Sequence, residues 1–520
     1  MTPPNSTATE KLEATTGGRT KSAAEAPHAG PALAVARRPI DWKRTGCILL
    51  GLVLFCVVYL SPPWSDAVDP QGEAFPLTNK GKASLALFLL TATWWVSEVI
   101  PIGVTSILIG VLQTIFLIRS PKEAFGDYMD PSVCFILGSI VIGLVFTKTG
   151  LAKRMAYKML VIVGERTTMI LLGCSLMTAC LTLIMAHTAV AATLFPLLMA
   201  IHSLYSEDGK PTRFGKALFI GMAFTAGAGS IITLLGSARA AVAIGFFKDM
   251  VGPEISFFQL SYYMFPLGIG MVLVLWALLA IVFRPEQKTV PGLRERARHL
   301  YARLGPMSRA EILALTIVFS LVALLSARSF THNEVLLNST DKSAIILLAM
   351  VLFFLFKILD INDLESIPWN IILLFGGAMS IGLCLWNTGA AKWLAVKWLV
   401  MFQGAPKLVF ILAIALFVLI MTNFIMNVAA IAISLPVAIV LARYLCVAPE
   451  VVFFASLATA GMPFVLLVGA APNAIAYGSG QFKSTEFFMA GIPASLILMA
   501  VLALFVWLIW PLMGMPVFLG

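Results

Sequence analysis

Apolar runs of about the length needed to cross a lipid bilayer recur along this 520-residue chain. A membrane helix needs roughly 20 mostly apolar residues. Charged residues make up 12% of the chain and hydrophobic residues 59%, whereas about a quarter of a soluble domain is charged. The sequence therefore predicts an all-α polytopic membrane protein with about eleven transmembrane helices. The expected spans are 46–61, 83–99, 103–118, 132–147, 214–247, 262–283, 310–326, 342–358, 369–386, 450–477 and 487–513.

Two further apolar stretches, 170–201 and 407–442, are too long for one simple span. Each has a polar patch in its middle. This pattern is typical of a re-entrant hairpin, in which two half-helices meet at a polar tip. The alternative is a single long tilted helix in each stretch.

Loop charge predicts the orientation, because Lys and Arg collect on the cytoplasmic side of a membrane. Segment 284–309 carries seven basic residues and two acids, and is expected to be a cytoplasmic linker. Residues 1–45 contain no apolar run and are expected to form a disordered cytoplasmic tail, whereas the acidic loop 62–81 should lie outside. Six crossings separate the tail from the linker only if 170–201 does not cross, which favours the hairpin. The C-terminus then lies outside.

The chain offers little to support other classes of protein. Its seven cysteines form no Cys-x-x-Cys pair and lie mostly in apolar runs, so they are expected to pack as small apolar side chains. The net charge is +10, but no basic helix with interleaved aromatic residues lies outside the membrane, and no nucleic-acid partner is expected. No nucleophile–base pair, metal cluster or phosphate loop indicates an enzyme.

An internal repeat relates the two parts of the chain on either side of the linker, 46–283 and 310–520. Three blocks match in the same order: 135–153 with 374–392, 186–196 with 426–436, and 236–243 with 469–476. An odd number of expected crossings separates matched blocks, so the repeats are predicted to be inverted in the membrane. Inverted repeats are typical of secondary transporters that work by alternating access.

Four polar breaks interrupt the apolar segments, and the chemistry is expected there. They are the hairpin tips at 186–188 and 426–428 and two Gly-rich segments, expected to be unwound, at 236–240 and 469–473. Backbone polar groups at membrane depth must be satisfied, so broken helices normally line a binding cavity. The N-termini of half-helices suit an anion, and nearby carbonyl and amide oxygens suit sodium. A dianionic carboxylate accompanied by cations is the expected substrate.

These blocks resemble the divalent anion:sodium symporters, a family that includes the dicarboxylate and citrate carriers. The resemblance covers roughly residues 83–513 and includes WWVSEVIPIGVTSIL at 94–108 and WNIILLFGG at 369–377. It implies an elevator-type homodimer in which a transport domain moves against a fixed scaffold domain.

The second half keeps more of the family's pattern than the first. In the family each hairpin tip carries Ser-Asn-Thr, and each unwound helix carries a turn like Gly-Thr-Pro-Pro-Asn. Here Asn427, Gly469 and Asn473 match that pattern. The second tip otherwise reads Met-Asn-Val and has lost both hydroxyls. The first tip has His187 in the place of Asn, and the first turn has Arg239 in the place of a Pro.

The resemblance and the membrane depth of these residues define two sets of candidates. Arg239 is interpreted as a fixed cation that replaces the first sodium or contacts a carboxylate, the alternative being an ion pair with Glu98. His187 is interpreted as a hydrogen-bond donor or proton carrier, the alternative being a buried side chain satisfied by carbonyl groups. The candidate substrate-binding residues are His187, Thr188, Arg239, Met426, Asn427 and Val428. The candidate sodium-binding residues are Gly236, Ser237, Thr422, Asn427, Gly469 and Asn473.

The function expected from these features is secondary transport of small dianions across the cell (inner) membrane. C4-dicarboxylates such as succinate, malate or fumarate are the leading substrates, moved by sodium symport or by anion exchange. Sulfate or another oxyanion is the alternative substrate. An anion channel is disfavoured, because it would not need paired re-entrant tips. No organic cofactor is expected, and sodium is the candidate coupling ion.

Overall fold

The computed structural model describes residues 42–68, 73–206, 210–330, 341–402, 406–424 and 426–517. Helices dominate these ranges, as the sequence predicts; two short strands, β1 (Ala67–Val68) and β2 (Ala74–Phe75), pair antiparallel. Nine helices in the described part are long and apolar enough to cross a membrane, and the expected eleven crossings stay a prediction. The expected tail, 1–45, lies outside the described residues except for its last four, which begin α1 (Trp42–Leu60).

The helices before and after the linker follow the same order. The first half contains α2 (Asn79–Ser97), α3 (Ile102–Ile115), α4 (Pro121–Gly126), α5 (Pro131–Thr149), α6 (Leu151–Val163), α7 (Thr167–Thr182), α8 (His187–Tyr205), α9 (Arg213–Ser230), α10 (Ala238–Val251) and α11 (Phe257–Val282). Their counterparts are α13 (Arg309–Arg328), α15 (Lys342–Leu355), α16 (Ile361–Glu365), α17 (Trp369–Asn387), α18 (Ala390–Phe402), α19 (Lys407–Phe424), α20 (Asn427–Tyr444), α21 (Pro449–Ala460), α22 (Ala471–Tyr477) and α23 (Ser484–Leu504). Even the left-handed residues that end α3 and α15 correspond: Leu117 has φ 52° and Lys357 has φ 55°.

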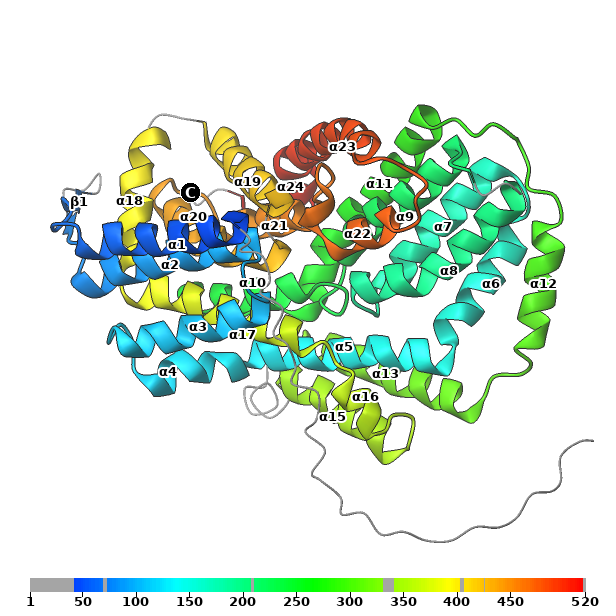
Figure 1. Cartoon of the computed structure of the whole chain (residues 1–520), viewed down its shortest axis with the longest axis horizontal. Helices are drawn as coiled ribbons and strands as arrows, with labels where there is room; N and C mark the ends of the chain where they lie inside the picture. The colour runs from blue at the N-terminus through cyan, green and yellow to red at the C-terminus, as the bar shows by residue number, and fades with distance from the viewer. Residues whose placement is uncertain are drawn as a thin grey trace, which may run out of the picture. The chain divides into compact units, whose positions relative to one another are not determined.

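The two halves pack crosswise. Helix α3 lies against α17, and its counterpart α15 lies against α5 (Figure 1). In the same way α10 packs on α20, and α22 packs on α8. Each half therefore completes the core of the other.

Both long apolar stretches contain two helices, so the alternative of one tilted helix is wrong. α7 and α8 are separated by residues 183–186, and α19 and α20 by 425–426. The residues before α8 and α20, Ala186 and Met426, have extended ψ angles of 137° and 143°. The two helices of each pair then pack on each other, as the hairpin prediction requires.

The two broken helices are interrupted slightly earlier than the sequence predicts. Helix is absent over 231–237, between α9 and α10, and over most of 461–470, between α21 and α22, where a single 3-10 turn spans Leu467–Gly469. The expected breaks at 236–240 and 469–473 therefore include the first turns of α10 and α22. The reason in the first half is Ser237, whose Oγ accepts a hydrogen bond from the Ala240 N–H and starts α10 as an N-cap.

The first hairpin tip touches the first unwound segment directly. A Cβ atom at Gly236 would collide with the carbonyl oxygen of Thr182 at the end of α7, so glycine is required there. Thr233 Oγ1 donates a hydrogen bond of 2.7 Å to the Leu183 carbonyl oxygen, within the tip. The tip and the unwound segment are thus held together by this hydrogen bond and by their close backbone approach at Gly236.

The basic linker is a packed element of the structure. It contains α12 (Leu293–Arg303), which packs alongside α6 (Figure 1). Arg154 of α6 is buried and pairs with the buried Glu311 of α13 through Nε and Oε1, 2.8 Å apart. Its guanidinium also donates to the carbonyl groups of residues 304, 305 and 306. One side chain therefore joins α6, the end of the linker and α13.

Replacing Arg154 by Ala is expected to lower the free energy of unfolding by about 3–5 kcal/mol, because Glu311 would stay buried without a partner. Thermal unfolding in detergent, followed by tryptophan fluorescence, measures the effect. Arg298→Ala, on the exposed side of α12, is the matched control and should leave the midpoint unchanged. Equal midpoints for the two variants would contradict the role of the ion pair.

Candidate functional site

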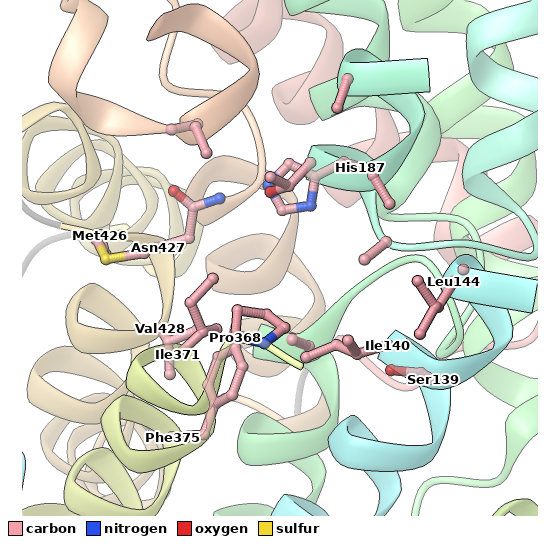
Figure 2. Close-up of a pocket in the computed structure, with 18 of the residues that line it drawn as sticks. Ser139, Ile140, Leu144, His187, Pro368, Ile371, Phe375, Met426, Asn427 and Val428 are labelled. Atoms are coloured by element: carbon pink, nitrogen blue, oxygen red, sulfur yellow. The ribbon is translucent and has the colours of Figure 1, made fainter. Parts of the chain in front are cut away.

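A cavity of about 430 Å³ lies where four helices begin. Its walls include the first residues of α8, α10, α20 and α22, one hairpin helix and one half-helix from each half of the chain. Side chains of α5, α17 and the segment that leads into α17 complete it (Figure 2). Because helix N-termini carry partial positive charge, this convergence favours an anion.

The two hairpin helices begin without a side-chain cap. The residue before α8 is Ala186 and the residue before α20 is Met426, and neither side chain accepts a hydrogen bond from the helix that follows it. The first N–H groups of a helix have no partner within the helix itself. Here they belong to residues that line the cavity, His187, Thr188, Asn427 and Val428, so the tips offer backbone donors to a bound group.

Arg239 places a full positive charge at the cavity. Its side chain is 1% exposed, and its Nη2 donates to Ser230 Oγ at 2.9 Å. Among the described residues no carboxylate pairs with it, and its Nε has no hydrogen-bond partner. Glu98, the acid proposed as a structural partner, is exposed and ends α2 in a left-handed conformation with φ 45°. The ion-pair interpretation is therefore wrong.

Gly461 leaves the space that the guanidinium occupies. A Cβ atom at this position would collide with Arg239 Nη2 and lie 2.6 Å from Ile231 Cγ2. Gly461 ends α21, while Ser230 ends α9. The charge is therefore held between the C-terminal ends of the two broken helices.

His187 and Asn427 point toward each other across the cavity (Figure 2). In the described structure, buried His187 Nδ1 has no hydrogen-bond partner. The ring also forms a hydrogen bond with the backbone of Gly236, so the alternative of a histidine satisfied by carbonyl groups is met for part of the ring and not for Nδ1. Asn427 Oδ1 accepts a hydrogen bond from Thr422 Oγ1 at 3.1 Å, which fixes the amide at the tip.

Two asparagines hold the second unwound segment in place. Asn423 Oδ1 accepts hydrogen bonds from the N–H groups of Val465 and Leu466 at 2.8 and 3.1 Å. Asn473 Nδ2 donates to the carbonyl oxygens of Pro463 and Leu466 at 2.9 and 3.2 Å. Asn423 was not among the predicted residues, although an amide beside Thr422 in an apolar run is a recognisable signal.

All six predicted substrate-binding residues line the cavity, together with the sodium candidate Gly469. The cavity lining does not include the other sodium candidates, which are Gly236, Ser237, Thr422 and Asn473. Their roles stay predictions. Sequence analysis does not predict the apolar wall that faces the tips, which is built by Ile140, Leu144, Pro368, Ile371 and Phe375. No cluster of three or more His, Cys, Asp or Glu side chains suited to a metal ion occurs in the described ranges.

Comparison with known proteins identifies relatives along nearly the whole chain. Residues 47–516 match the family described as "Sodium:sulfate symporter transmembrane region". The sodium-dependent dicarboxylate transporter SdcS of Staphylococcus saprophyticus is 29% identical over 490 residues, which are 90% of this chain and 92% of the relative. SdcS of Staphylococcus aureus is 28% identical over 494 residues, 92% and 93% of the two chains.

Two solved structures share the fold at low sequence identity. MtrF of Neisseria gonorrhoeae, described as illuminating a class of antimetabolite efflux pumps, has a TM-score of 0.57 at 13% identity and covers 90% of this chain and 95% of its own. The YdaH transporter of Alcanivorax borkumensis has a TM-score of 0.50 at 14% identity, with 91% and 98% covered. Both likenesses bear on the fold alone.

Replacing Gly461 by Ala is expected to destabilise the protein by about 1–3 kcal/mol, because the added methyl group overlaps the Arg239 guanidinium. Gly221→Ala on α9 is the matched control, since a Cβ there meets only Leu279 Cδ1 at 3.5 Å. Thermal midpoints in detergent compare the two. Arg239→Ala combined with Gly461→Ala should recover part of the loss, and strict additivity of the two changes would contradict the contact.

Proposed function

The chain belongs to the family of sodium:sulfate symporter transmembrane regions, and from this premise we propose that it is a sodium-coupled carrier of small divalent anions. Its leading substrates are C4-dicarboxylates such as succinate, malate and fumarate. The observation that carries the proposal is the cavity at which the N-termini of α8, α10 and α20 meet an arginine that pairs with no carboxylate among the described residues. The names of the Staphylococcus relatives support sodium and dicarboxylates.

Charge balance suits this substrate. A buried charge is costly unless it is paired or solvated, and within the described ranges Arg239 is hydrogen-bonded to one side chain, the neutral Ser230. A carboxylate that contacts the guanidinium would supply the missing charge. His187, Thr188 and the first-turn N–H groups of α8 would orient that carboxylate, and Asn427 with the N-terminus of α20 would receive the second.

Sodium is proposed for the second half alone. Thr422, Asn427, Gly469 and Asn473 lie around the unwound segment 461–470 and offer amide, hydroxyl and carbonyl oxygens, the ligands of a hard cation. In the first half the guanidinium of Arg239 already bonds to Ser230 beside the corresponding break. We infer that it takes the place of a first sodium ion.

Alternating access would carry the anion across. Exposed residues at one end of the cavity, Thr147, Ser366 and Pro368, form its mouth. Because α5 leads there into α6 and the basic linker, we propose that this end is cytoplasmic, with the C-terminus outside. A homodimer with fixed scaffold domains is part of the same proposal.

Anion exchange is the second candidate, favoured by the permanent charge of Arg239. A carrier with a fixed cation in its empty site returns poorly without an anion, whereas a sodium ion can leave. Exchange would need no sodium gradient, and an internal anion would be required for each turnover.

We expect purified protein in liposomes to accumulate labelled succinate only when sodium is present outside, whether or not unlabelled succinate is inside. Four combinations of external sodium and internal succinate test this. Uptake that ignores sodium but needs internal succinate would establish exchange and overturn the coupling. Uptake of sulfate without succinate would identify an oxyanion carrier.

Asn473→Ala is expected to raise the sodium concentration for half-maximal uptake about tenfold, equivalent to about 1.4 kcal/mol, because it removes an amide that orders segment 461–470. Asn370→Ala is the matched control: its Oδ1 accepts from the Gly103 N–H, and neither residue lines the cavity. An unchanged sodium dependence in Asn473→Ala would count against a second-half sodium site.

A further inference from the structure

The cavity has one polar side and one apolar side. His187 and Asn427 lie along one edge, and Val428, Ile371, Pro368, Phe375 and Ile140 lie along the opposite edge (Figure 2). Phe375 is 4% exposed and Val428 5%, so both are fixed parts of the wall. A bound dicarboxylate would direct its carboxylates to the tips and its carbon skeleton to the apolar wall.

The hydroxyl groups near this wall have already used their protons. Ser139 Oγ donates to the Ile136 carbonyl oxygen at 2.8 Å, and Ser366 Oγ donates to the Asp363 carbonyl oxygen at 2.8 Å. Thr147 Oγ1 donates to the Gly143 carbonyl oxygen and lies 3.2 Å from Thr193 Oγ1. A hydroxyl on the substrate skeleton would therefore meet no free side-chain donor on this side.

The second hairpin tip, 426–428, also adds apolar surface to the cavity. Met426 and Val428 flank Asn427, and neither can donate or accept a hydrogen bond with its side chain as a hydroxyl does. The cavity volume of about 430 Å³ lies within the range of sites for drug-sized ligands. An unbranched four-carbon skeleton would leave part of the apolar wall wet, and an alkyl branch would cover it.

We propose that this cavity selects dicarboxylates with an alkyl-branched skeleton over hydroxylated ones, with Val428, Ile371 and Phe375 as the selecting surface. The inference rests on the proposed dicarboxylate function and narrows it, because it ranks malate, one of the substrates named above, below alkyl-branched dicarboxylates. Its physical basis is that a hydroxyl placed against Val428, Ile371 and Phe375 loses its hydrogen bonds to water and finds no polar side chain among these three, while a methyl group gains apolar contact.

An isosteric pair of ligands tests the proposal, 2-methylsuccinate and 2-hydroxysuccinate (malate), which differ by a methyl and a hydroxyl group at one carbon. Each competes with labelled succinate for uptake into liposomes and, separately, shifts the thermal midpoint of the purified protein. We expect 2-methylsuccinate to bind at least about tenfold more tightly than malate, which corresponds to 1.4 kcal/mol. Equal affinity, or tighter binding of malate, would overturn the selection.

Val428→Thr sharpens the test, because it places a hydroxyl on the wall without changing the side-chain shape. It should move the ratio of the two affinities at least threefold toward malate. Val437→Thr, on the same helix but in the second cavity, is the matched control and should leave the ratio unchanged. An unchanged ratio in Val428→Thr would remove this residue from the selecting surface. If neither ligand nor succinate binds, the dicarboxylate function itself fails, an outcome distinct from equal binding of the two analogues.

Discussion

Hydrogen bonding of backbone outside helices is the constraint on which this structure depends. In an apolar interior, each unpaired N–H or C=O group costs several kcal/mol, yet the fold breaks two helices and turns two hairpins beside the cavity. Side chains supply hydrogen bonds to part of this backbone. Asn423 and Asn473 bond to the second unwound segment, and Thr233 bonds to the first hairpin tip. The tips and breaks can therefore present their remaining donors to a ligand while these side chains hold the irregular backbone in place.

Arg239 also has few polar partners, and for this reason its positive charge dominates the site. Arg239 is buried with a serine as its hydrogen-bonding side chain, and Gly461 provides the space for its guanidinium. A carboxylate from the protein in the same place would neutralise it permanently and leave the helix ends as the only attraction for an anion. The absence of such an acid among the described residues keeps the positive charge available, and the crosswise packing of the two halves brings Arg239 and the second hairpin tip to the same cavity.

Much of this arrangement follows from the sequence, and what does not has a physical reason. Apolar runs, loop charge and the repeat predict the helical membrane fold, and polar residues within the two long runs predict the hairpins. His187, Arg239 and Asn427 are visible as polar side chains at apolar depth, and they do line one cavity. Phe375 and Ile371 carry no such signal, because an apolar residue that faces a cavity looks like one that faces lipid or core. The start of α10 is missed by three residues, since a single serine cap decides it.

The basic linker, 284–309, is bonded to the rest of the protein near both of its ends, which limits the insertions it can accept. Surface connections usually accept inserted residues at little cost. Here the backbone of Val290 and Lys288 is bonded to Glu165 and Thr167 at the junction of α6 and α7, with an N···O distance of 2.8 Å for the first pair, while Arg154 holds the other end. The two ends of the linker are thus held at fixed positions relative to the two repeats. An insertion at either bonded junction would therefore disrupt contacts that an ordinary surface loop does not make.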